Sequence, residues 1–90
     1  MKRYFIKYKG IVQGVGFRFR IQQLASKYDI AGYIANLDDG SVEVEAQGQT
    51  ANLDEFLKES LHLGGFVQIE DYAVKEISVD EYDKTFIVYY

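Results

Sequence analysis

Residues 10–18 read Gly10-Ile11-Val12-Gln13-Gly14-Val15-Gly16-Phe17-Arg18 and separate two segments of different hydrophobic periodicity. Before them, residues 2–9 alternate between apolar or aromatic and basic side chains, which predicts a half-buried strand. After them, apolar residues from Phe17 to Tyr28 recur at helical spacing and predict an amphipathic helix of about three turns. The chain therefore begins with a strand, a glycine-rich loop and a helix.

The same patterns predict the elements that follow. In chain order we expect a strand over 31–37, a hairpin turn over 38–41, a strand over 42–47, a helix capped by Thr50 and ended by Gly64-Gly65, a strand around 73–82, and a short strand to residue 90. The order β-α-β-β-α-β, with a short terminal strand, predicts an α+β fold of the ferredoxin-like type. In that fold two helices pack on one face of an antiparallel sheet. We expect a single domain over residues 1–90.

Composition narrows the classes of function. The 90 residues include no Cys, which excludes a disulfide framework and a thiolate metal site. No apolar run approaches the length of about 20 residues that a membrane helix needs. We therefore expect a cytoplasmic monomer with no membrane association, no metal and no cofactor.

Charge is unevenly distributed along the chain. The net charge of −4 opposes generic nucleic-acid binding, so we expect no nucleic-acid partner. Basic residues nevertheless concentrate in the first twenty positions, at Lys2, Arg3, Lys7, Lys9, Arg18 and Arg20. This asymmetry indicates an anion site near the N-terminus.

The glycine loop is where such an anion could bind. Glycines let successive backbone N–H groups turn inward, and a helix N-terminus adds about half a positive charge. Arg18, in the first helical turn, adds a planar fork of donors that suits a phosphate. The alternative is a plain strand-to-helix turn with a solvated Arg. The loop is neither a Walker loop, since no Gly-Lys-Ser/Thr follows, nor a dinucleotide fingerprint, since Phe19 stands where the third Gly would be.

Several motifs together resemble those of one family. Residues 12–18, Val-Gln-Gly-Val-Gly-Phe-Arg, are similar to the N-terminal signature of acylphosphatases. Residues 32–42 resemble the second signature, Gly48 falls at the expected place after it, and residues 86–90 resemble the aromatic tail of the family. The resemblance runs from the first strand to the last residue. It implies hydrolysis of the carboxyl-phosphate bond of small-molecule acyl phosphates to a carboxylate and inorganic phosphate, without a metal.

The resemblance also implies roles for individual residues. An Asn before a turn usually bonds the local backbone, and that is the alternative role for Asn36. The family's motif makes Asn36 the residue that orients the attacking water for in-line displacement, while the water's proton passes to the substrate's own phosphate. The implied catalytic residues are Arg18 and Asn36, and the implied phosphate-binding loop is Gln13, Gly14, Val15, Gly16, Phe17 and Arg18.

Three positions depart from the family's usual pattern: Ile11, Ile34 and Ala35. They bear on affinity and rate more than on reaction type.

One alternative function is a noncatalytic ferredoxin-like module that binds phosphate or another ligand. Another is a free-standing version of the acylphosphatase-like domain of hydrogenase-maturation carbamoyltransferases, which carry zinc-finger cysteines that this sequence lacks.

A few other polar residues are assigned structural roles. Glu43 and Glu45 alternate along one strand face and are predicted to form a solubilising surface. His62 is predicted to interact with the C-terminus of the second helix, and Arg20 to enrich the basic end of the molecule.

Overall fold

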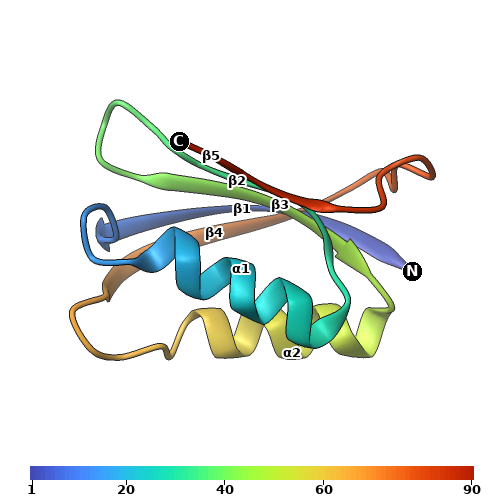
Figure 1. Ribbon diagram of the computed structural model, residues 1–90, viewed down its shortest axis with the longest axis horizontal. Helices are drawn as coiled ribbons and strands as arrows, with labels where there is room; N and C mark the ends of the chain where they lie inside the picture. The colour runs from blue at the N-terminus through green and yellow to red at the C-terminus, as the bar shows by residue number, and fades with distance from the viewer.

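The computed structural model describes all 90 residues and confirms the predicted order of elements. Two helices cover one face of a five-stranded sheet (Figure 1). Neither helix is long and apolar enough to cross a membrane. In chain order the elements are β1 (Lys2–Ile11), α1 (Phe17–Tyr28), β2 (Ala31–Asn36), β3 (Val42–Gly48), α2 (Thr50–Ser60), β4 (Gln68–Ile77) and β5 (Phe86–Tyr89).

The strands lie in the order β4-β1-β3-β2-β5. β1 pairs antiparallel with both β3 and β4, and β2 pairs antiparallel with β3, as the ferredoxin-like prediction requires. The short terminal strand β5 pairs parallel with β2, with Tyr33 opposite Ile87, so the complete sheet is mixed. This pairing brings the C-terminal residues beside the strand that ends in Asn36.

Three predicted boundaries are wrong. The first is the end of α2, which lies at Ser60 and not at Gly64-Gly65. The strand expected around 73–82 is β4, which begins at Gln68 and ends at Ile77. Residues 78–85 instead form a loop that the Gln47 side chain holds, because its amide donates to the carbonyl oxygen of Asp80 (2.8 Å) and its oxygen accepts from the N–H of the same residue (2.9 Å). Thr50 is the first helical residue of α2 and does not cap it, since Gln49 occupies the cap position without a side-chain hydrogen bond.

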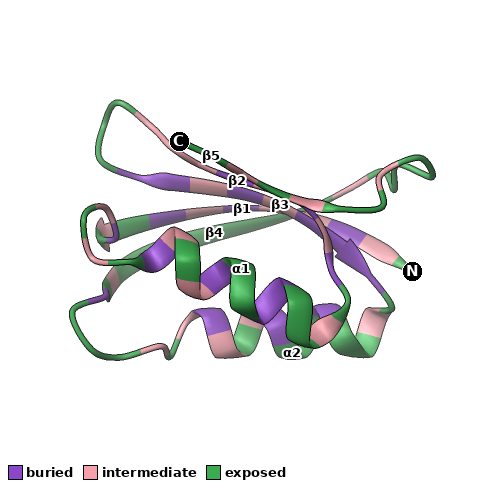
Figure 2. Cartoon of the chain, in the orientation of Figure 1, coloured by how far each residue is buried: buried purple, intermediate pink, exposed green.

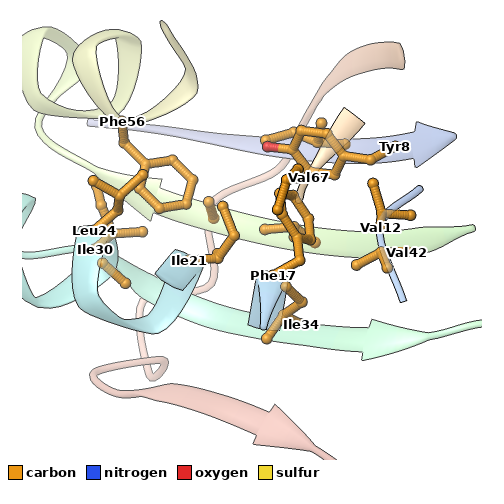
Figure 3. Close-up of a cluster of buried hydrophobic side chains, with 14 of the residues drawn as sticks. Tyr8, Val12, Phe17, Ile21, Leu24, Ile30, Ile34, Val42, Phe56 and Val67 are labelled. Atoms are coloured by element: carbon orange, nitrogen blue, oxygen red, sulfur yellow. The ribbon is translucent and has the colours of Figure 1, made fainter. Parts of the chain in front are cut away.

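The core lies between the sheet and the two helices (Figure 3). In Figure 2 the buried stripes of α1 and α2 face the sheet and their outer faces are exposed. Phe17, the first residue of α1, is buried and its ring meets the ring of Tyr8 edge-on, with 5.0 Å between centroids. This aromatic contact anchors the start of α1 to the sheet and thereby fixes the position of the next residue, Arg18.

Candidate active site

One end of the sheet gathers the β1–α1 loop, the β2–β3 turn and the C-terminal residues (Figure 1). A cavity of about 160 Å³ lies there, lined by the loop, the first turn of α1, the end of β2 and the C-terminal residue. Both Arg18 and Asn36 line it. The two side chains that the sequence assigned to catalysis, 18 positions apart in the chain, therefore share one cavity.

The loop leaves the start of α1 open. Gly14 and Gly16 have φ values of 73° and 78°, in the left-handed region that favours glycine. A Cβ atom at either position would meet nothing within 4 Å, so the backbone conformation and not lack of space requires glycine. Gly16 is the N-cap of α1 and no side chain caps the helix. The backbone N–H groups of the first turn thus remain available to an anion in the cavity.

Arg18 is held at the edge of this cavity by the C-terminal residues. Its Nη1 donates a hydrogen bond to the carbonyl oxygen of Tyr89 (2.8 Å), and its guanidinium carbon lies 4.9 Å from the centroid of the Tyr90 ring. No carboxylate forms an ion pair with it. One of its five donors is therefore used in positioning, and its charge is not neutralised by a neighbouring acid.

Asn36 is the last residue of β2 and lies opposite Val42 of β3. Its Oδ1 atom is buried and accepts no hydrogen bond from any protein group. A buried acceptor without a donor costs about 1–3 kcal/mol, so such an atom calls for an explanation. Because Asn36 lines the cavity, a water molecule or ligand bound there would supply the donor.

Gln13 connects the β1–α1 loop to the β2–β3 turn. Its side-chain amide donates to the carbonyl oxygens of Leu37 (2.8 Å) and Ser41 (2.9 Å), which flank the turn after Asn36. The sequence assigned Gln13 to the phosphate-binding loop, but this side-chain amide is bonded to the turn. Its contacts fix the β1–α1 loop, which precedes Arg18, relative to the end of β2.

The β2–β3 turn has its own hydrogen bonds and one ion pair. The carboxylate of Asp39 accepts hydrogen bonds from the hydroxyl and the backbone N–H of Ser41, and it lies 3.4 Å from the Lys7 ammonium. The bonds from Ser41, chiefly that of its side chain, lower the pKa of Asp39 to about 2. A backbone bond from Leu37 N–H to the Ser41 carbonyl oxygen (2.9 Å) closes the turn. Asn36 therefore precedes a hairpin whose turn is closed by several hydrogen bonds.

Of the six residues predicted to form the phosphate loop, Gly14, Gly16, Phe17 and Arg18 line the cavity, whereas Gln13 and Val15 do not. Phe19 also lines the cavity, although no role was predicted for it from the sequence. The signal was present, because Phe19 is an apolar residue on the polar face of an amphipathic helix.

The family model described as Acylphosphatase matches residues 4–88. The chain belongs to the acylphosphatase family. An acylphosphatase of Clostridium acetobutylicum is 44% identical over 90 residues, covering 100% of this chain and 99% of the relative. One of Thermotoga maritima is 37% identical over 90 residues and covers 100% of both chains.

Solved structures agree with this membership. The crystal structure of acylphosphatase from Bacillus subtilis superimposes with a TM-score of 0.94 at 37% identity over 100% of both chains. Full-length HypF, in its phosphate- and nucleotide-bound form, superimposes with a TM-score of 0.90 at 29% identity, over 98% of this chain and 12% of HypF. The fold and the family predicted from the sequence are thereby confirmed.

Outside the cavity of this acylphosphatase-family chain, one minor prediction is wrong and a second is incomplete. Glu43 and Glu45 do not form a plain solubilising surface, since both accept hydrogen bonds from the Tyr33 hydroxyl (2.6 and 3.2 Å) and Glu45 also pairs with Arg3 Nε at 2.9 Å. Arg20 does more than add charge. It donates to carbonyl oxygens of the loop after α2, with Gly64 at 2.9 Å.

The predicted role of His62 is consistent with its place just after α2, where its ring Nδ1 lies 2.9 Å from the Lys58 carbonyl oxygen. No group of three His, Cys, Asp or Glu side chains comes together in positions that could hold a metal ion.

Proposed function

We propose that this member of the acylphosphatase family hydrolyses the carboxyl-phosphate bond of acyl phosphates in the cavity shared by Arg18 and Asn36. The observation that carries the proposal is the buried, unpartnered Oδ1 of Asn36, which lines the same cavity as an uncapped helix N-terminus and an unpaired guanidinium. The Asn36 oxygen suits a water molecule, and the helix N-terminus and the Arg18 guanidinium suit a phosphoryl group.

The phosphoryl group binds where donors converge. The backbone N–H groups at the start of α1 and the remaining donors of Arg18 contact its non-bridging oxygens. These donors are fixed in advance by the glycine loop and by the contact between Arg18 and the Tyr89 carbonyl oxygen. They therefore stabilise the charge that these oxygens carry in the transition state without reorganising.

The attacking water is oriented by Asn36. Its Oδ1 accepts a hydrogen from the water, which directs a lone pair of the water toward phosphorus. A new bond forms between the water oxygen and phosphorus while the bond from phosphorus to the acyl oxygen breaks, and the water's proton passes to the phosphate itself. The products are a carboxylate and inorganic phosphate.

The residues of the cavity also favour this substrate class. No His, Cys, Asp or Glu lines it, so no strong general acid stands ready to protonate a leaving group. A carboxylate leaves as a stable anion at neutral pH and needs no such acid, because carboxylic acids have pKa values of about 4. An alkoxide, the leaving group of a phosphate monoester, would need a general acid to protonate it. Acyl phosphates fit this site better than phosphate monoesters.

A noncatalytic phosphate-binding module is the competing function. Such a module would bind phosphate at the same donors without turnover, so hydrolysis of an acyl phosphate by the parent protein decides between the two functions. We further propose that the protein acts as a cytoplasmic monomer on a small-molecule substrate, with no metal, cofactor or nucleic-acid partner. The net charge of −4 supports the last point.

The test is benzoyl phosphate hydrolysis in the presence of EDTA, comparing the parent with Arg18→Ala and Asn36→Ala. We expect activity in the parent, and a loss of about a hundred- to a thousandfold in kcat for Asn36→Ala with a smaller effect on KM. Arg18→Ala should impair both kcat and KM. Asn52→Ala, an exposed asparagine on α2, is the matched control and should behave like the parent. Full activity in Arg18→Ala or Asn36→Ala would refute the role assigned to that residue.

A further inference from the structure

The cavity has an apolar wall that phosphate binding does not use. Phe19 is 62% exposed and Tyr90 is 96% exposed, and both line the cavity. The neighbouring exposed positions of α1 are polar: Gln22, Gln23, Ser26 and Lys27. Phe19 is thus a large apolar side chain on a helix face that otherwise meets water, and core packing does not account for it.

The roles of the other lining residues leave this apolar wall to contact the acyl group of the substrate. In-line attack puts the acyl oxygen on the side of phosphorus opposite the water, so the acyl group points away from Asn36. Gly14, Gly16 and Arg18 are assigned to the phosphoryl group. Of the other lining residues, Val12 and Phe17 are each only 1% exposed and belong to the core. Phe19 and Tyr90 are the side chains left to contact an acyl group.

We propose that Phe19 and Tyr90 form an acyl-group subsite that selects acyl phosphates with an aromatic or extended apolar acyl group over those with a small or polar one. The inference rests on the proposed function. An aryl group that leaves water to contact these rings gains from apolar burial and from favourable ring–ring geometry. The methyl of acetyl phosphate and the amide of carbamoyl phosphate offer little surface for either interaction.

Phe19 gives the sharper test of the two. The Tyr90 ring also packs over the Arg18 guanidinium, so truncating Tyr90 would disturb phosphate binding as well. Phe19 has no hydrogen bond or ring contact with Arg18, and its truncation should act on the acyl group. Phe66, 82% exposed in the loop between α2 and β4 and not part of the cavity lining, is the matched control.

The experiment measures kcat/KM for benzoyl phosphate and acetyl phosphate in the parent, Phe19→Ala, Phe19→Leu and Phe66→Ala. We expect the benzoyl-to-acetyl ratio to fall about 5- to 10-fold in Phe19→Ala, through a higher KM for benzoyl phosphate. Phe19→Leu should recover part of the ratio, and Phe66→Ala should retain all of it. The inhibition constant of inorganic phosphate, which has no acyl group, reports on the phosphate loop in each variant.

The outcomes separate this inference from the proposed function. If the parent hydrolyses neither substrate, the proposed function fails. If the parent hydrolyses both and Phe19→Ala keeps the parental ratio, the acyl subsite alone is overturned. A parallel loss on both substrates, together with weaker phosphate inhibition, would also overturn it, because Phe19 would then act on the phosphate loop.

Discussion

The buried pair of hydroxyl groups from Tyr8 and Ser60 gives a prediction in which two substitutions together cost less stability than one of them alone. The hydroxyl oxygens lie 2.6 Å apart, and both residues are fully buried. Ser60 Oγ also donates to the Leu57 carbonyl oxygen (2.6 Å), which uses its single hydrogen. Tyr8 must therefore be the donor to Ser60.

The direction of this hydrogen bond determines how much each substitution lowers the free energy of unfolding. Ser60→Ala leaves the Tyr8 O–H buried without an acceptor and should lower the free energy of unfolding by about 2 kcal/mol. Tyr8→Phe removes the donor while Ser60 keeps its bond to Leu57, and should cost about 1 kcal/mol. The Leu57 carbonyl oxygen also accepts from Leu61 N–H (3.3 Å), so it keeps a partner in every variant. The double variant removes both hydroxyls and should also cost about 1 kcal/mol, less than Ser60→Ala alone.

The assay is urea unfolding of the four proteins followed by far-UV circular dichroism, which reports mainly on the backbone and is compared by its unfolding midpoint. Thermal unfolding is a second readout. There we expect a Tm about 10 °C below the parent for Ser60→Ala and about 5 °C below it for the double variant. Additive losses, with the double variant less stable than Ser60→Ala, would refute the assigned bond direction and the cost of the stranded donor.

Three further predictions concern the loop, a turn and the open face of the sheet. Gln13→Ala should lower kcat for benzoyl phosphate about 10- to 100-fold with little change in phosphate inhibition, because the turn after Asn36 loses its hydrogen bonds to the β1–α1 loop. Asp39→Asn should lower stability at neutral pH, since the pKa of Asp39 is depressed to about 2 by its bonds to Ser41. The stabilisation is complete above the unfolded-state pKa of about 4 and is lost as pH falls through about 2, so urea midpoints of parent and variant should converge over that interval. Arg3→Met should lower the free energy of unfolding by about 2–3 kcal/mol in urea titrations, because it strands the two partly exposed carboxylates that pair with Arg3; an unchanged midpoint would contradict this.

The sequence predicted those elements that bury one face and expose the other. β1, β3 and the two helices follow clear periods of two or 3.6 because the core lies on one side of them. β4 is an edge strand with mostly exposed residues, so no alternation marked where it begins, and its position was set by pairing with β1. Residues 78–82, the first part of the loop at 78–85, were mistaken for strand for the same reason.

Long-range contacts account for what else the sequence could not reveal. Arg3 sits in a strand where alternation predicts a solvated base, yet only 6% of it is exposed, because Asp83 from the β4–β5 loop pairs with it at 2.9 Å across 80 positions of chain. The placement of Arg18 and Asn36 at one site was predicted through motif resemblance. Local pattern alone would have left Asn36 as an ordinary turn residue. The contacts of Gln13 with the β2–β3 turn and the place of Phe19 in the cavity lining came only from the three-dimensional structure.

A crystal structure of the protein grown with inorganic phosphate, the product of the proposed reaction, would show whether Arg18 and Asn36 face one phosphoryl group. We predict one phosphate bound at the backbone N–H groups that open α1, in contact with the Arg18 guanidinium, and a water molecule bridging it to Asn36 Oδ1. A phosphate ordered at another site, with none bound at the loop or at these two side chains at saturating phosphate concentration, would refute the proposed site.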